Sequence, residues 1–188
     1  MTTVRAGPFV LYFVCAVLLS TNSGSSKSRD PIRIALSPDT TQNIIAHIVG
    51  RALTNAGFEH EFVKIDQQTI ATISSGEAHF DPYFEVPKVR EPLDRAILEQ
   101  RVYSLGGLRS NDPDEPALKI IWVGVRNKWP NAEKMFKRMI MPVEEVNVMA
   151  SSVDAGDAKL ETVVDAWMAE NKSSWKSWIS ASTNWMKP

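Results

Sequence analysis

The chain has 188 residues, of which 44% are hydrophobic and 23% charged, and its formal net charge is -1 at pH 7. This composition is typical of a globular protein and excludes a disordered chain. The nearly balanced charge excludes a strong overall field that would attract nucleic acid or an anionic membrane, so we expect no nucleic-acid partner.

The first stretch of the chain has the order of a secretory signal peptide. One basic residue, Arg5, precedes an apolar run over residues 8–19, and small polar residues follow that run. The run is short for a membrane span, which needs about 20 residues. Cys15 lies inside the run and is interpreted as part of the signal. We therefore expect residues 1–26 to be cleaved and the protein to be secreted or periplasmic; the alternative is an uncleaved N-terminal helix that anchors it.

The first elements of the mature chain alternate between strand and helix patterns. Residues 31–36 form a β-like run, and the turn formers at 37–39 follow it. Over residues 40–58 the apolar side chains recur at helical spacing. Thr40 or Thr41 is the expected N-cap of this helix, and Gly57 is the expected residue just after its end.

The same alternation continues toward the middle of the chain. Strand patterns occur at residues 60–66, 79–86 (a strand or strand-end loop) and 101–107, with helix patterns at 67–76 and 90–100. Strands that alternate with helices at this spacing predict right-handed crossovers and a parallel sheet.

Residues 119–125 form the clearest strand pattern. They are apolar almost throughout, which predicts a central strand buried on both faces. A polar loop at 108–117 precedes them. From residue 131 onward the pattern is helical, with helices expected at 131–141 and 142–153 before a tryptophan-rich tail.

Four of the six tryptophans lie within residues 161–185. On a helix, Trp167, Trp178 and Trp185 fall within roughly 20° of one another, with Trp175 about 80° away. A stripe at helical spacing is more often core than a ligand cage. We therefore interpret these tryptophans as anchors that hold terminal helices onto the sheet.

Motifs for catalysis or metal binding are absent from the sequence. The three histidines lack metal-ligand spacing and are interpreted as structural. No glycine-rich phosphate loop, nucleophile elbow or HExxH motif occurs. We therefore expect no enzyme activity, no catalytic residue, no metal and no cofactor.

Ligand recognition is suggested by residues 80–87, FDPYFEVP. They follow the third strand pattern, and ligands in open parallel sheets lie outside the carboxyl ends of the strands. Tyr83, Phe84 and Glu85 could contact a small cation through ring faces and a carboxylate. The alternative is a strand end with two buried aromatic residues.

Four stretches of the chain are also similar to a known family: VGRALTNAGFEHEFVKID, ISSGEAHFDPYFEVP, VGVRNKWPNAEKMFKRMIMPVEEVNVM and VVDAWMAENKSSWKSWI. In these stretches the chain resembles the glycine betaine/choline-type substrate-binding proteins of ABC importers. The resemblance implies one α/β lobe of the type II periplasmic-binding-protein fold, with a mostly parallel sheet, flanking helices and a helical C-terminus. It also implies osmolyte import with a permease partner, and tail tryptophans that serve packing.

From this resemblance we expect a ligand site built from two segments. Tyr83, Phe84 and Glu85 would hold the cationic head of a quaternary amine. Asp39 and Thr40 lie at the first strand-to-helix turn, where Thr40 or the backbone amides of the helix start could bind a ligand carboxylate.

The chain departs from that family in two respects. Family members trap the ligand between two lobes, whereas here the loop at 108–118 takes the place of the second lobe, so residues 30–107 and 119–187 would form a single lobe. The family's ligand loop supplies a tryptophan or tyrosine to an aromatic cage, but the matching stretch at 81–87 has no tryptophan.

These departures weaken capture by one lobe alone. An exposed cation–π contact contributes only about 0.5–1 kcal/mol, whereas micromolar binding needs about 8 kcal/mol. A partner would have to supply the other wall of the ligand site, either as a second lobe or as a second copy of the chain. The alternative function is a protein-interaction module that has lost small-molecule binding.

Overall fold

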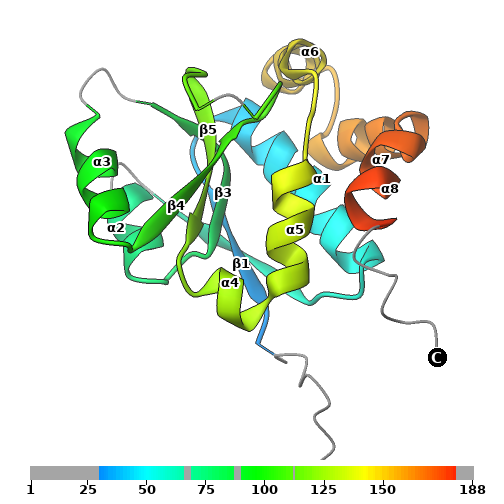
Figure 1. Ribbon diagram of the computed structural model, residues 1–188. Coiled ribbons are helices and arrows are strands. Elements are labelled where there is room, and N and C mark those ends of the chain that lie inside the picture. Colours follow the sequence, from blue (N-terminus) through cyan, green and yellow to red (C-terminus); the bar gives the residue numbers. More distant parts are fainter. Residues whose placement is uncertain (1–29, 66–68, 87–89, 112, 181–188) are drawn as a thin grey trace, which may run out of the picture.

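A computed structural model describes residues 30–65, 69–86, 90–111 and 113–180 (Figure 1). The expected signal peptide and Trp185 lie outside the described residues. The elements, in chain order, are β1 (Ile32–Leu36), α1 (Thr40–Asn55), β2 (His60–Lys64), α2 (Thr69–Ser74), β3 (Phe80–Glu85), α3 (Glu91–Leu98), β4 (Val102–Gly107), β5 (Ala117–Trp122), α4 (Val125–Lys128), α5 (Pro130–Arg138), α6 (Val143–Asp154), α7 (Leu160–Glu170) and α8 (Lys172–Ser180).

The five strands form one sheet in the order β2-β1-β3-β5-β4. β1 runs parallel to β2 and β3, and β5 runs antiparallel to both of its neighbours, β3 and β4. The expected α/β fold with a mostly parallel sheet is therefore confirmed. The one reversed strand is β5, because only the short loop at 108–116 joins it to β4, and a short loop connects antiparallel strands.

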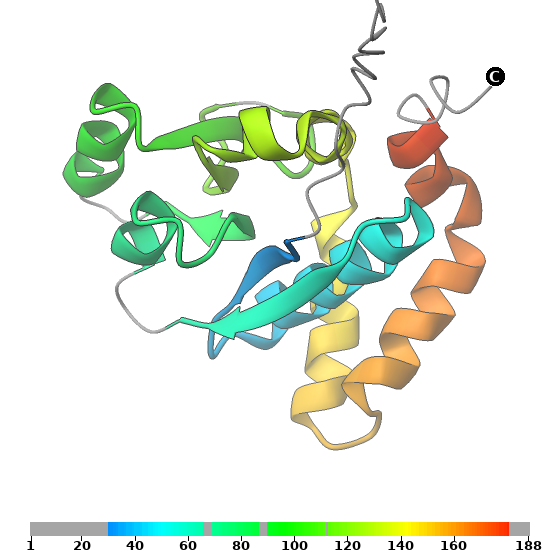
Figure 2. The same cartoon turned by 90° about the horizontal axis from the view of Figure 1, so that it is seen from below.

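Helices cover both faces of the sheet (Figures 1 and 2). One face packs against α1 and α5–α8, and the other packs against α2 and α3. The strand expected at 119–125 is β5, buried at every position except the half-buried Trp122. It ends earlier than expected, since residues 125–128 turn into α4.

Helix α1 follows its sequence pattern closely. The apolar side chains at 44, 45, 48, 49, 52 and 53 are all fully buried. The expected N-cap was wrong: Asp39 caps the helix, and its Oδ1 accepts a hydrogen bond from the backbone N–H of Gln42 at 2.7 Å. A carboxylate on an extended residue reaches the free amides of the first turn better than a threonine already inside the helix. Gly57 has the positive φ, 78°, expected of the residue after a helix.

The core interpretation of the tail tryptophans is confirmed for the three that the structure describes. Trp167, Trp175 and Trp178 are buried, and the rings of Trp167 and Trp178 stack with centroids 6.2 Å apart. Trp175 donates its indole N–H to the carbonyl of Met168 at 2.8 Å. Among the described residues, the helices are all too short or too polar to cross a membrane.

Candidate functional site

The carboxyl ends of β1 and β3 meet the start of α1 at a small hollow of about 180 Å³. Such an edge is where open α/β sheets place their ligands. Four of the five residues predicted for the site lie here together. The lining residues are Ser37, Asp39, Gln42, Thr69, Asp81, Tyr83, Phe84 and Glu85.

Thr40, the fifth predicted residue, is not among the lining residues. Its hydroxyl donates to Oδ1 of Asp154, at the end of α6, at 2.6 Å. A ligand carboxylate placed beside Thr40 would therefore face the carboxylates of Asp154 and Asp39. This arrangement disfavours the carboxylate site expected at the start of α1.

A bulge in β3 shapes the wall of the hollow. Asp81 pairs with Ile120 of β5 and Phe84 pairs with Leu118, so β3 holds one extra residue between these pairs. Pro82 lies in this bulge, where its missing N–H costs no ladder hydrogen bond. The backbone N–H of Tyr83 does not pair with β5 but donates to Oδ1 of Asp81 at 3.0 Å.

The bulge also separates the two aromatic residues. Tyr83 is half-buried and packs against the core on the α1 face. Phe84 is only 8% exposed and belongs to the core on the α2–α3 face. Tyr83 therefore offers its ring to a ligand, whereas Phe84 mainly supplies an apolar wall.

Asp81 is the most deeply buried acidic group of the hollow, at 1% exposure. Its Oδ1 accepts a hydrogen bond from Nε2 of Gln42 at 2.7 Å, besides that from Tyr83. Burial raises the pKa of Asp81 to about 6, although these two hydrogen bonds favour the charged form.

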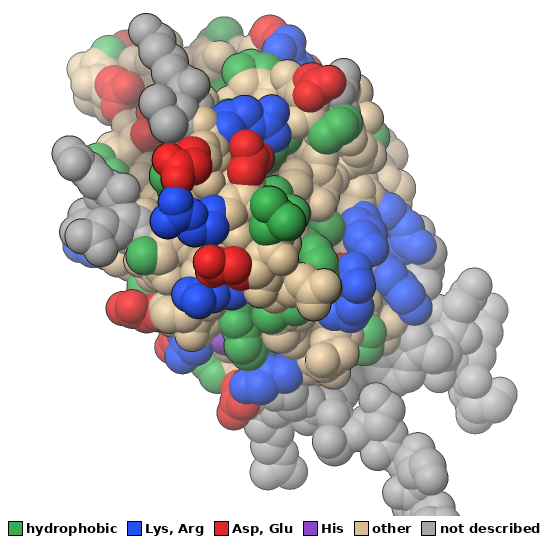
Figure 3. Space-filling view, turned by 60° about the vertical axis from the view of Figure 1, so that its left-hand side comes forward, with side chains coloured by type: hydrophobic (Ala, Val, Ile, Leu, Met, Phe, Trp, Pro, Cys, Tyr) green, Lys and Arg blue, Asp and Glu red, His purple; other side chains and the backbone are tan. Residues whose placement is uncertain are grey.

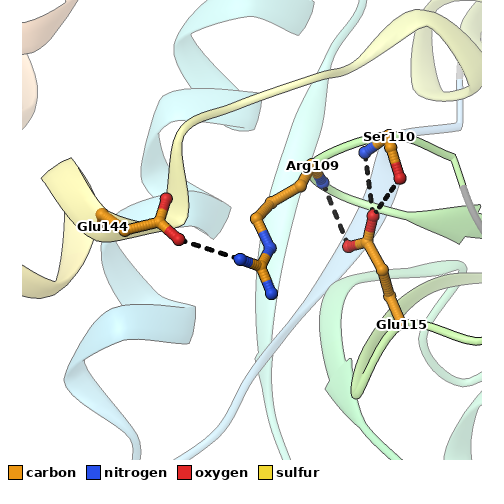
Figure 4. Close-up of polar contacts among 4 residues, drawn as sticks. All are labelled: Arg109, Ser110, Glu115 and Glu144. Carbon is orange, nitrogen blue, oxygen red and sulfur yellow. Dashed lines mark hydrogen bonds and ion pairs between the residues drawn. The ribbon is translucent and has the colours of Figure 1, made fainter.

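The surroundings of Tyr83 are mainly acidic. Burial is the largest cause of its raised pKa, and the charges of Glu85 and Asp39 raise it further. Arg109 acts in the opposite direction, but its Nη1 is paired with Oε1 of Glu144 at 2.9 Å (Figure 4). None of the described residues that line the hollow is basic. The site therefore favours a cation.

The loop between β4 and β5 is held in place beside this edge. Glu115 accepts hydrogen bonds from the backbone N–H groups of Arg109 and Ser110, at 3.2 and 2.9 Å, and from the Ser110 hydroxyl at 2.6 Å (Figure 4). These bonds fix the backbone from which Arg109 reaches α6.

Sequence reasoning missed Gln42 and Asp81. Each is a polar residue within an otherwise apolar pattern: Gln42 precedes the buried face of α1, and Asp81 lies inside a strand pattern. Buried polar groups are almost always hydrogen-bonded. Two polar residues at positions where the pattern predicts burial could therefore have been predicted to hydrogen-bond to each other.

The three histidines pack against aromatic rings, His47 and His60 against Phe62 and His79 against two tryptophans. The imidazole of His79 lies 5.4 Å from the ring of Trp122 and 4.8 Å from that of Trp129, between centroids. Burial, and then the charge of Arg33, lower the pKa of His79 to about 4. Within the part of the chain that the structure describes, no cluster of three or more His, Cys, Asp or Glu residues could hold a metal ion.

Comparison with known proteins gives a likeness of fold. No family model matches the chain. Among solved structures, the chain is similar to lactococcal OpuAC in its closed-liganded conformation complexed with glycine betaine, with a TM-score of 0.67 and 10% sequence identity. The match covers 80% of this chain and 100% of that chain. At this identity the likeness shows a periplasmic-binding-protein-like fold.

Proposed function

We propose that this protein binds a small organic cation in the hollow at the carboxyl ends of β1 and β3. The observation that carries the proposal is a hollow lined by three carboxyl groups and the ring of Tyr83 but by no described basic residue. An aromatic face and carboxylates together attract a cation. The similar lactococcal protein, which was complexed with glycine betaine, adds that this fold can hold such a ligand.

In the finer form of the proposal, the protein is the ligand-binding component of an ABC-type importer of quaternary amines such as glycine betaine or choline. It would act outside the cytoplasmic membrane and deliver an osmoprotectant to a permease. The sequence resemblance and the signal-like N-terminus support this form. No catalytic step is part of it.

The hollow is smaller than most complete ligand sites. Its volume of about 180 Å³ falls below the range of about 300–1,000 Å³ that is usual for ligand pockets. We therefore propose that a permease, a second lobe or a second copy covers it when the ligand is fully enclosed.

Titration calorimetry with glycine betaine, choline and carnitine tests the proposal. We expect heat from at least one of these cations. Tyr83→Leu should weaken that binding about 2- to 30-fold, because one cation–π contact contributes about 0.5–2 kcal/mol. Glu61→Gln, which removes an exposed charge on β2, is the control and should change little. Silence toward all three cations up to about 10 mM, a binding free energy of only about 2.7 kcal/mol, would contradict the proposal.

A protein-interaction module is the second candidate. A larger groove of about 830 Å³ lies between α2 and α3 and favours it. Ile70, Phe84, Pro92 and Ala96 contribute its apolar lining. Figure 3, turned so that the α2–α3 side faces the reader, shows hydrophobic side chains among charged ones on this surface. Silence in calorimetry would favour this candidate.

A further inference from the structure

Helices α4 and α5 carry a local excess of positive charge, although the whole chain is nearly neutral. Glu133 is the only acidic residue between positions 126 and 138. Figure 3 shows Lys and Arg side chains gathered on the right of the view, the side toward which α5 turns from Figure 1. We call the exposed cations of this stretch the basic patch; they are Arg126, Lys128, Lys134, Lys137 and Arg138.

The cations of α5 lie together on its outer face. At about 100° per residue, Lys134, Lys137 and Arg138 fall within an arc of roughly 100°. This arc lies opposite Met135 and Phe136, which are fully buried in the core. Among the described residues, none forms an ion pair with Lys134 or Arg138. These two charges are therefore available to a partner.

The other three cations of the basic patch are only partly neutralised. Arg126 and Lys137 share the carboxylate of Glu133, at 3.3 and 2.8 Å, and the Glu133 side chain is only 8% exposed. Lys128 pairs with Asp30 at 3.2 Å. Five cations thus face two carboxylates, and the patch keeps a net local charge of +3.

The neighbouring elements add no negative charge. α5 packs mainly against α4, α8 and β4. α8 contains Lys172 and Lys176 and no acidic residue, and β4 contains no charged residue. Ile140, just after α5, is 46% exposed and gives the patch an apolar edge. Such a surface attracts an anionic partner.

The N-terminal part of the chain joins the molecule beside this patch. Asp30, which pairs with Lys128, is the first described residue. The apolar run at 8–19 precedes it in the sequence, and residues 20–29 between them can span at most about 35 Å. If that run remains in a membrane as an anchor, the basic patch is held close to the lipid headgroups.

We propose that the basic patch docks the protein on an anionic lipid surface, with Lys134 and Arg138 directed at headgroup phosphates. Cations within a screening length of such a surface are attracted to it. The exposed Ile140 would enter the interface beside them. No cation of the patch lines the hollow. The inference therefore goes beyond the proposed function and leaves the hollow free for its ligand.

Vesicle sedimentation with the full chain tests the inference. Pure phosphatidylcholine is compared with equal parts of phosphatidylcholine and phosphatidylglycerol, so that insertion of the apolar run would contribute to both. We expect at least about 30-fold tighter binding to the anionic vesicles at low salt, since each Lys or Arg near such a surface contributes about fivefold. Raising the salt from about 0.1 M to about 1 M shortens the screening length from about 10 to about 3 Å and should reduce the preference below about threefold. Equal binding at low salt, or a preference that survives high salt, would overturn the inference.

Two double variants of equal charge locate the preference. Lys134→Gln with Arg138→Gln should lower it at least about tenfold and leave the fold intact, because both side chains are exposed. Lys64→Gln with Lys159→Gln removes the same charge at exposed positions in β2 and just before α7 and should keep the preference. Equal losses in both would mean that only net charge matters and would overturn the inference. Binding of polyglutamate without binding of anionic vesicles would assign the patch to an acidic protein and overturn it too.

Discussion

Asp81 is a buried acid whose cost to the fold depends on pH. Its pKa in the folded protein is about 6, above the usual 3.8, because burial penalises the charged form. The folded state therefore binds a proton more tightly than the unfolded state between these values. The stabilising contribution of the protonated carboxyl is complete below about pH 4 and is lost as the pH rises through about 6.

Replacing Asp81 with Asn tests this cost. The change keeps an oxygen that can accept from Gln42 and Tyr83 but removes the buried charge. A difference of about two pKa units corresponds to at most about 3 kcal/mol. We expect the variant to gain about 1–3 kcal/mol in free energy of unfolding at pH 7.5 and nothing at pH 4, and to bind cations more weakly. Urea denaturation at both pH values measures the first effect, with the exposed Asp157→Asn as control. A gain of equal size at both pH values would contradict the assignment.

At the scale of elements, the loop after β4 depends on a glycine. β4 carries its own bulge between Ser104 and Gly107, opposite the bulge in β3. Gly106 has φ of 78° there, and a Cβ added to it would lie 2.1 Å from the backbone oxygen of Asn111. Asn111 in turn accepts a hydrogen bond from the fully buried amine of Lys119. This amine also donates to the carbonyl of Met139 at 2.7 Å, so it ties the loop and the end of α5 to β5.

Replacing Gly106 with Ala should therefore destabilise the protein by about 2–5 kcal/mol. The left-handed backbone accounts for about 1–2 kcal/mol and the backbone clash for about 1–3 kcal/mol. Gly156→Ala is the matched control, because its φ is 79° but nothing lies within 4 Å of an added Cβ. Thermal unfolding of both variants measures the difference. Equal losses would mean that the contact with Asn111 relaxes without cost.

At the scale of the whole molecule, the last two helices complete the larger core. α7 and α8 lie beside α1 and α5 (Figures 1 and 2). Trp178 is 2% exposed in this core, and its ring stacks on that of Trp167. The C-terminal helices therefore hold the same helix, α1, whose first turn forms the hollow.

Trp178→Ala should lower the free energy of unfolding by about 3–5 kcal/mol, the usual cost of removing a buried tryptophan. Ser173→Ala, at an exposed position in the same helix, should change it by less than about 0.5 kcal/mol. Urea denaturation followed by circular dichroism compares the two. If Trp178→Ala behaved like the control, the stacked tryptophans would contribute little to the core.

How far the site could be predicted differs between its residues. Tyr83 and Glu85 were predicted because an aromatic–acidic run follows a strand pattern. Asp39 was placed at the right turn, but its role as N-cap was assigned to a threonine. Gln42 was missed because a polar residue at the start of a helix has an ordinary explanation in solvent, and only its distant partner Asp81 makes it part of a site. That residues 108–118 replace a second lobe stays a prediction.

The sequence by itself determined the helix α1, the succession of strands and helices along the chain, and the burial of the tail tryptophans that the structure describes. These features are local, since the period of apolar side chains records which face of one element is buried. The tertiary structure decided that β5 lies reversed between β3 and β4, that β3 bulges at Pro82, and that Gln42 meets Asp81 across 39 residues of chain. Pairing between distant segments produces no periodic pattern of apolar residues in the sequence. That pairing decides which side chains line the hollow, so the sequence alone could not predict them.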